Sequence, residues 1–304
     1  MQTIWLDLLG AKVHMLGGKY RTRVIEAGDG PPLLLLHGIG GHAEAYARNI
    51  VRLGQDMRAM AIDFVWHGLS SKPPYVDGED IPTYADQVID LLDAEGIDRV
   101  HIEGESLGGW VGLHLALHHP ERVADLVLNT TAGIRFAPGV VQERTKEGRE
   151  ALASRSLAAI SEPTPEAIRK RLEWLMASPD RVTHELVDLR LRLYSDPAIQ
   201  DSLRSVFRNA FGEQGAPRKT IDEGELTSVA ARTLVLWTDH NPGTGPDVGR
   251  RIAAMIPDAQ FVCVEDAAHW PQWEQPETHD LLVAGFLRGE DVGERIETVA
   301  ASGA

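Results

Sequence analysis

The chain has 304 residues, a formal net charge of -15 and a single cysteine, Cys263. The acidic charge argues against a nucleic-acid partner, whose phosphates basic side chains would have to neutralise, and one cysteine cannot form an internal disulfide. No segment has the roughly 18 uncharged apolar residues of a membrane-spanning helix, and the first residues lack a basic, apolar leader. We therefore expect a cytoplasmic protein without a membrane partner, built as one core with an insertion.

Seven short apolar runs are predicted to be strands, and segments with helical spacing lie between most of them. The runs cover residues 21–26, 33–36, 57–62, 100–103, 126–129, 233–237 and 260–264. This alternation predicts an α/β fold with a mostly parallel sheet, expected to hold eight strands, and helices on both faces. We expect the core to span 1–135 and 226–290, an inserted helical lid 136–225, and a flexible tail 291–304.

The lid is expected to be helical because no strand-like run interrupts its helical spacing. Thr164 and Thr183 are predicted N-caps, and Pro165 is predicted at the first helical position after Thr164. The tail is charged and has no long apolar period, so we expect it to fray.

A glycine-rich loop, His37 to Gly41, follows the strand predicted at 33–36. Its glycines allow the main chain to approach a reacting carbonyl, so the N–H of Ile39 or Gly40 is a candidate oxyanion donor. We expect His37 to brace the loop rather than to act as a second base. A plain glycine turn is the alternative.

The segment Gly104–Gly108 lies between the strand predicted at 100–103 and a helical run that begins at Gly109. This arrangement is typical of a nucleophile elbow, in which small residues allow a sharp reversal and the central Ser106 projects its Oγ into a cleft. The N–H of Leu107 would lie at the N-terminus of the following helix, where it can face a developing oxyanion. Here too, a plain glycine-rich turn is the alternative.

A serine hydroxyl is a weak nucleophile and needs an imidazole to accept its proton. His269 is the candidate base, because it follows the last predicted strand and the order serine, acid, histidine suits an elbow of this type. The acid should follow the strand at 233–237, where Asp239 and Asn241 compete. We prefer Asp239, because an amide cannot stabilise an imidazolium. Asp247 is a third carboxylate, expected in the first turn of the next helix.

Three segments resemble the α/β-hydrolase superfamily and, within it, the meta-cleavage-product hydrolases, which break a carbon–carbon bond in ring-opened aromatic catabolites. They are the elbow, 104–109, the region 268–274 and the lid segment 183–190. The resemblance implies an α/β-hydrolase fold. It also implies an enzyme that acts without cofactor or metal on a small-molecule substrate, a 2-hydroxy-6-oxo-dienoate. It also implies that Arg190 binds the substrate carboxylate and that Trp270 lines the pocket. The chain has Glu105 and Asn241 where the family usually has asparagine and the triad aspartate.

The position of Arg190 on its predicted helix supports a functional role independently. It falls between Leu186 and Val187 in an apolar arc, whereas Arg192 points to the opposite side. A guanidinium on an apolar face needs an anionic partner, either an internal carboxylate or that of a substrate. We expect the segment 63–70, after the strand at 57–62, to be architectural, with Trp66 as a candidate for the lining of the cleft.

The preferred function is therefore a serine hydrolase that cleaves a carbon–carbon bond. One alternative is an ester or lactone hydrolase for a hydrophobic substrate. Another is a ligand-binding protein on a hydrolase scaffold, because Asn241 in place of the triad aspartate would weaken catalysis. The sequence leaves the oligomeric state open, and a homodimer is one candidate.

Overall fold

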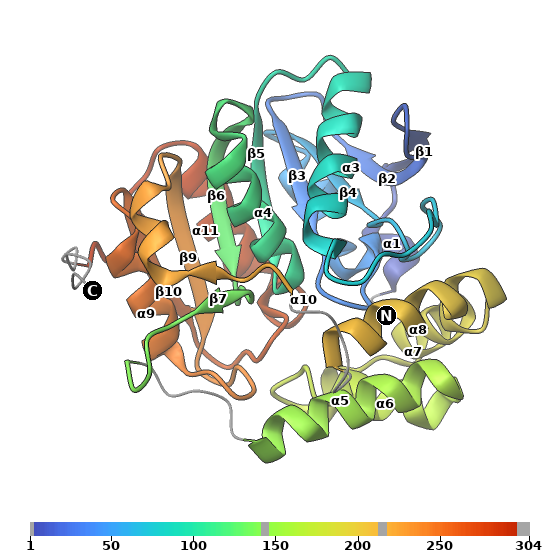
Figure 1. The fold of residues 1–304 in the computed structure, drawn as a ribbon. Helices are drawn as coiled ribbons and strands as arrows, with labels where there is room; N and C mark the ends of the chain where they lie inside the picture. Colours follow the sequence, from blue (N-terminus) through green and yellow to red (C-terminus); the bar gives the residue numbers. More distant parts are fainter. Residues whose placement is uncertain (1–2, 141–145, 212–217, 297–304) are drawn as a thin grey trace.

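The structure, a computed structural model, describes residues 3–140, 146–211 and 218–296. An eight-stranded sheet runs through its centre in the order β1-β2-β4-β3-β5-β6-β9-β10 (Figure 1). The strands are β1 (Lys12–Leu16), β2 (Thr22–Ala27), β3 (Pro32–Leu36), β4 (Arg58–Ile62), β5 (Val100–Glu105), β6 (Val123–Asn129), β9 (Arg232–Thr238) and β10 (Ala259–Val264). All pairs from β4 to β10 in this order are parallel, whereas β2 pairs antiparallel with β1 and with β4. The expected mostly parallel sheet is confirmed.

Within the eight-stranded sheet, the strand that sequence reasoning missed is β1, at one edge. Its residues Lys12, Val13 and Met15 are exposed, and His14 and Leu16 are only partly buried. An edge strand pairs on one side only and has little core to face, so it need not carry the apolar run that marks a buried strand. The other seven strands coincide with the seven predicted runs.

Helices cover both faces of the sheet (Figure 1). Helices α3, α4 and α9 pack on one face, and α2 and α11 on the other. The core helices are α1 (Ile4–Asp7), α2 (Ile50–Leu53), α3 (Asp80–Ala94), α4 (Leu107–His118), α9 (Pro246–Met255), α10 (Pro271–Glu274) and α11 (Pro276–Leu287). Among the described residues, no helix combines the length and apolarity needed to cross a bilayer.

Four helices, α5 (Lys146–Ser161), α6 (Pro165–Glu173), α7 (His184–Tyr194) and α8 (Pro197–Phe211), form a layer at one end of the sheet (Figure 1). They lie within the expected lid interval. Thr164 Oγ1 accepts the N–H of Ala167, and Thr183 Oγ1 that of Leu186, so both predicted N-caps are confirmed. The interval also holds a strand that was not expected, because β8 (Ile221–Asp222) pairs with β7 (Ile134–Arg135). Two residues are too short for a recognisable strand pattern.

The first part of the expected flexible tail is tied to the sheet. Gln260 on β10 accepts the N–H groups of Val292 and Gly293 through its Oε1. Phe261 and Glu294 exchange two backbone hydrogen bonds of 2.7 and 2.9 Å. The expectation is therefore wrong for residues 291–296, because the chain adds a bridge to the sheet edge there. Residues 297–304 lie outside the described part of the chain.

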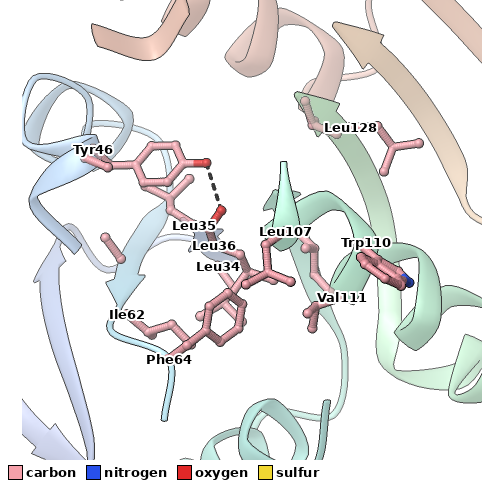
Figure 2. Packing of buried hydrophobic residues seen from close by; sticks show 14 of the residues in the cluster. Leu34, Leu35, Leu36, Tyr46, Ile62, Phe64, Leu107, Trp110, Val111 and Leu128 are labelled. Carbon is pink, nitrogen blue, oxygen red and sulfur yellow. Dashed lines mark hydrogen bonds between the residues drawn. The ribbon is translucent and has the colours of Figure 1, made fainter. Parts of the chain in front are cut away.

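The centre of the core supports the start of α4. Figure 2 shows Leu34, Leu35 and Leu36 of β3 packed among large apolar side chains from neighbouring elements, with the Tyr46 hydroxyl donating to the carbonyl of Leu36 at 3.2 Å. The same carbonyl would lie 2.1 Å from a Cβ placed on Gly108. The first turn of α4 thus packs directly on β3, which leaves room for glycine alone at that position.

Candidate active site

Ser106 lies at a strained turn between β5 and α4, with φ 54° and ψ -108°. A Cβ on Gly104 would lie 2.2 Å from the backbone of Gly108, so the reversal requires small residues at both ends. Backbone bonds hold the turn, because the N–H of Ser106 donates to Asn129 and its carbonyl accepts from Ala132. Non-glycine residues rarely adopt such a conformation, and strain of this kind is typical of functional positions. The segment has the geometry of the predicted elbow.

The serine opens onto two adjoining cavities beneath the lid. The larger has a volume of about 420 Å³ and a mostly apolar wall, which includes Trp110, Trp174 and Trp237. The smaller, of about 20 Å³, has the size of a single water molecule. Ser106 and His269 line both. Within the described residues, no three His, Cys, Asp or Glu side chains are grouped as a metal ion would require.

His269 lies in the loop between β10 and α10, where main-chain contacts hold it. Its N–H donates to the carbonyl of Leu175 in the lid at 2.9 Å, and its own carbonyl accepts from the Thr130 hydroxyl at 3.0 Å. The imidazole Nδ1 lies 2.7 Å from Oδ1 of Asn241. The structure thus brings the predicted base to the cavity that Ser106 lines, and the lid helps to hold it there.

The contact with Asn241 corrects the preference for Asp239 as the residue beside His269. Both oxygens of Asp239 accept backbone N–H groups, from Asp266 at 3.0 Å and from Ala267 at 3.2 Å. Partial burial alone would raise the pKa of Asp239, but these N–H groups outweigh it and lower the pKa below its usual value. The carboxylate is therefore engaged in the turn after β10. Asp247 lies in the first turn of α9, as expected.

Glu105 is a site residue that sequence reasoning noted only as a departure from a family pattern. Its side chain is about 1% exposed, and its Oε1 lies 3.1 Å from Nε2 of His269. Its Oε2 accepts the N–H of Gly38 at 2.6 Å. One signal in the sequence could have identified it, namely a carboxylate at the last position of a buried strand, directly before Ser106.

The glycine-rich loop contributes Ile39 to the walls of both cavities, and Leu107 lines the larger one. No hydrogen bond within the described residues uses the N–H of Ile39 or Leu107. Gly40 lines neither cavity, and its carbonyl accepts a hydrogen bond from the Tyr194 hydroxyl at 2.8 Å. Ile39 and Leu107 are thus the candidate oxyanion donors that the geometry favours over Gly40.

His37 braces this loop, as its position suggested. Its ring Nε2 accepts the N–H of Phe64 at 3.1 Å, so Nδ1 carries the proton and donates to the carbonyl of Gly38 at 2.7 Å. Burial lowers the pKa of His37 to about 4, which keeps the ring neutral.

Arg190 is buried on α7, about 1% exposed, whereas Arg192 on the same helix is exposed, as the helical wheel predicted. Arg190 itself lines neither cavity, but its guanidinium carbon lies 5.2 Å from the ring centre of Trp270, which lines the small one. Its Nε and Nη2 atoms have no hydrogen-bond partner among the described residues. Burial lowers the pKa of Arg190, and the nearby Tyr194 and Glu105 oppose that shift.

Trp66 does not line either cavity, so this expectation is wrong. Its backbone adopts φ 66°, and the indole packs against Tyr75 and Tyr84 with ring centres 4.8 and 5.3 Å apart. The indole N–H donates to the carbonyl of Pro73 at 2.6 Å. The turn therefore directs this side chain into the core beside α3 instead of the cleft.

Comparisons with known proteins agree with this geometry. Residues 31–276 match the family model described as alpha/beta hydrolase fold. The chain is 29% identical to a 2-hydroxymuconate semialdehyde hydrolase of Pseudomonas putida, over 91% of this chain and 94% of the relative. It is 30% identical to a 2-hydroxy-6-oxononadienedioate/2-hydroxy-6-oxononatrienedioate hydrolase of Paraburkholderia xenovorans (strain LB400), over 89% and 91% of the two chains. The solved meta-cleavage product hydrolase CumD of Pseudomonas fluorescens IP01 superimposes with a TM-score of 0.76 at 26% identity, covering 92% of this chain and 99% of that one. These matches confirm the resemblance to meta-cleavage product hydrolases, and the match to the family model shows that the chain belongs to the α/β-hydrolase family.

Proposed function

We propose that this protein is a serine hydrolase that cleaves a carbon–carbon bond in a ring-opened aromatic catabolite of the 2-hydroxy-6-oxo-dienoate type. Ser106 is the nucleophile, His269 the general base, and Asn241 orients the imidazole. The observation that carries the proposal is the shared lining of one cavity by Ser106 and His269, close to the buried Arg190. The names of the relatives support the substrate class.

The residues at the cavity allow a two-stage reaction. Nε2 of His269 accepts the proton of Ser106 Oγ while Oγ bonds to the distal carbonyl carbon of the ketonised substrate. The carbonyl electrons move onto the oxygen, which the N–H groups of Ile39 and Leu107 stabilise. As the oxyanion collapses, the carbon–carbon bond breaks and the departing carbon takes the proton from His269. Water then attacks the acyl-serine, again with His269 as base, and releases a carboxylic acid.

Arg190 gives the substrate class its physical basis. A buried guanidinium with unpartnered N–H groups is costly, because a desolvated cation needs hydrogen-bond acceptors. The carboxylate of a dienoate would supply both charge and acceptors, since carboxylate oxygens match the fork of guanidinium donors. Trp270 lies beside this guanidinium and lines the small cavity, so it would line the surroundings of the carboxylate.

The presence of Glu105 favours a second candidate, an ester or lactone hydrolase for a hydrophobic substrate. Glu105 places a negative charge in the wall of the small cavity, and this charge acts on Arg190. An internal carboxylate would repel that of a substrate and reduce the need for one. The larger cavity, with three tryptophans in its wall, suits a neutral apolar group.

Turnover of two substrate classes tests the proposal. Purified protein would be incubated with a panel of ring-cleavage dienoates and with neutral aryl esters, and absorbance would follow each reaction. We expect dienoates to give the higher kcat/KM and Ser106→Ala to abolish turnover of both classes. Efficient turnover of esters alone would favour the second candidate. If neither substrate class showed turnover that depends on Ser106, a serine hydrolase would be refuted.

We further propose cytoplasmic residence and a homodimer. Exposed apolar side chains on α1 and β1, which follow one another in the chain, support an association surface, with Trp5 75% and Val13 62% exposed. Light scattering of the purified protein and fractionation of the source cells test the two proposals. A monomer at micromolar concentration would refute the dimer.

A further inference from the structure

We propose that Glu105 supplies the negative charge that stabilises the His269 imidazolium during hydrolysis, in place of the carboxylate that Asn241 lacks. Glu105 is thus a positioning residue that acts through His269. The inference rests on the proposed hydrolysis by Ser106 and His269, but not on the identity of the substrate.

The Glu105 carboxylate is held beside the base by two contacts. Oε1 lies 3.1 Å from Nε2 of His269, which is ion-pair distance, and Oε2 accepts the N–H of Gly38 at 2.6 Å. A Cβ on Gly38 would lie 2.4 Å from Oε2, so the loop approaches this closely only because position 38 has no side chain. With about 1% of the side chain exposed, water does not screen the pair as it would at the surface. The carboxylate is therefore fixed where a positive charge on Nε2 would be stabilised.

A triad acid selects the tautomer of the imidazole and stabilises the imidazolium, and Asn241 performs only the first of these tasks. Its Nδ2 donates to the carbonyl of Thr244 at 3.1 Å and to the Thr244 hydroxyl at 2.7 Å. Since a carbonyl can only accept, this pairing turns Oδ1 of Asn241 toward Nδ1 of His269. Nδ1 must then carry the proton, which leaves Nε2 free to act as base. The amide selects the tautomer but brings no charge.

The missing task, stabilisation of the imidazolium, falls to Glu105 because the other candidate acid is engaged elsewhere. Asp239 accepts two backbone N–H groups in the turn after β10. When Ser106 gives its proton to Nε2, the new cation forms 3.1 Å from Oε1 of Glu105. The proton stays on Nε2 until the leaving group takes it, so Glu105 acts through its charge and needs no proton of its own. The guanidinium of Arg190 acts on Glu105 from the lid side.

A double-mutant cycle, in which a carboxylate is removed at position 105 and introduced at position 241, tests the inference. The assay uses a neutral aryl ester, so no substrate carboxylate takes part. We expect Glu105→Gln to lower kcat about ten- to a hundredfold, the usual range for one charge-assisted contact. KM should change less than about threefold, because the imidazolium forms after binding. In the Asn241→Asp background a carboxylate at Nδ1 replaces the lost charge, so Glu105→Gln should cost less than about threefold there. Equal losses in both backgrounds would show that Glu105 has a merely structural role and would overturn the inference.

A single substitution gives a second test, should Glu105→Gln fail to fold. If Glu105 already compensates the imidazolium, Asn241→Asp alone should raise kcat less than about tenfold, whereas an uncompensated imidazolium would gain orders of magnitude. A gain above about a thousandfold would overturn the inference. Glu103→Gln is the matched control, because Glu103 is a buried carboxylate of the same strand that contacts His279 and not His269. It should show no coupling with Asn241→Asp.

Failure of the proposed function would look different. Turnover of the ester that survives Ser106→Ala would refute hydrolysis by this serine, whatever the result at Glu105. Ester turnover that depends on Ser106 but not on Glu105 would refute the inference alone.

Discussion

Replacement of Arg190 by glutamine separates the two candidate functions. Arg190 is about 1% exposed, and its Nε and Nη2 have no partner among the described residues. A substrate carboxylate would satisfy these donors through charge-assisted bonds worth about 1.5–3 kcal/mol. At about 1.4 kcal/mol per factor of ten, Arg190→Gln should lower kcat/KM for a dienoate roughly ten- to a hundredfold. A neutral ester makes no such contact and should lose less than about threefold.

The assay compares kcat/KM for one dienoate and one neutral aryl ester across three proteins. These are the native chain, Arg190→Gln, and Arg192→Gln as the matched control, since Arg192 is an exposed arginine of the same helix. The control should leave both values unchanged, because the guanidinium of Arg192 is exposed to solvent and already hydrated. Thermal unfolding of each protein shows whether the lid remains folded.

Equal losses on both substrates would refute this reasoning. They would indicate that Arg190 is an internal counter-charge for Glu105, with which it interacts electrostatically. Arg190 would then not be the partner of a substrate carboxylate. The ester or lactone hydrolase would become the better-supported function.

Three further predictions concern the triad and a buried network. Ser106→Ala should reduce turnover below about a thousandth of the native value, because residual catalysis then comes from the oxyanion donors and binding alone; higher single-turnover activity would exclude Ser106 as nucleophile. Asn241→Ala should lower kcat by more than about tenfold and Asp239→Asn by less than about threefold, because only Asn241 contacts the imidazole; the reverse order in steady-state assays would restore Asp239 as the acid. Burial alone lowers the pKa of His279, but contacts with Glu103 and Asp280 outweigh it and raise the pKa from 6.5 to about 10. The stabilisation by protonated His279 is therefore complete below pH 6.5 and is lost as the pH rises toward 10, so His279→Gln should lower the free energy of unfolding most near pH 6 and least near pH 10. Urea unfolding at both pH values checks this, and an equal loss at both would contradict it.

Several features of the protein follow from the sequence because they depend on neighbouring residues. The glycines around Ser106 predict the elbow, since steric overlap over a few residues requires them. The seven buried strands appear as apolar runs, because a strand covered on both faces has no polar side. Thr164 and Thr183 predict helix starts through a bond to an N–H three residues away.

Other features depend on segments that meet only in the folded chain. Whether Asp239 or Asn241 lies beside His269 was decided by Thr244, which turns the amide of Asn241, and by the turn after β10, which occupies the Asp239 carboxylate. The edge strand β1 was missed because its side chains have little core to face. Trp66 was misplaced because its left-handed backbone directs the indole into the core.

The contact between Glu105 and His269 shows most clearly what tertiary structure adds. Each residue could be seen in the sequence, one directly before Ser106 and one after the last strand. Their proximity depends on the parallel order of β5, β6, β9 and β10, which brings the carboxyl ends of distant strands to one edge of the sheet. A side chain's local sequence can predict that it reaches this edge, but the partner that it meets there is set by the packing of the whole sheet.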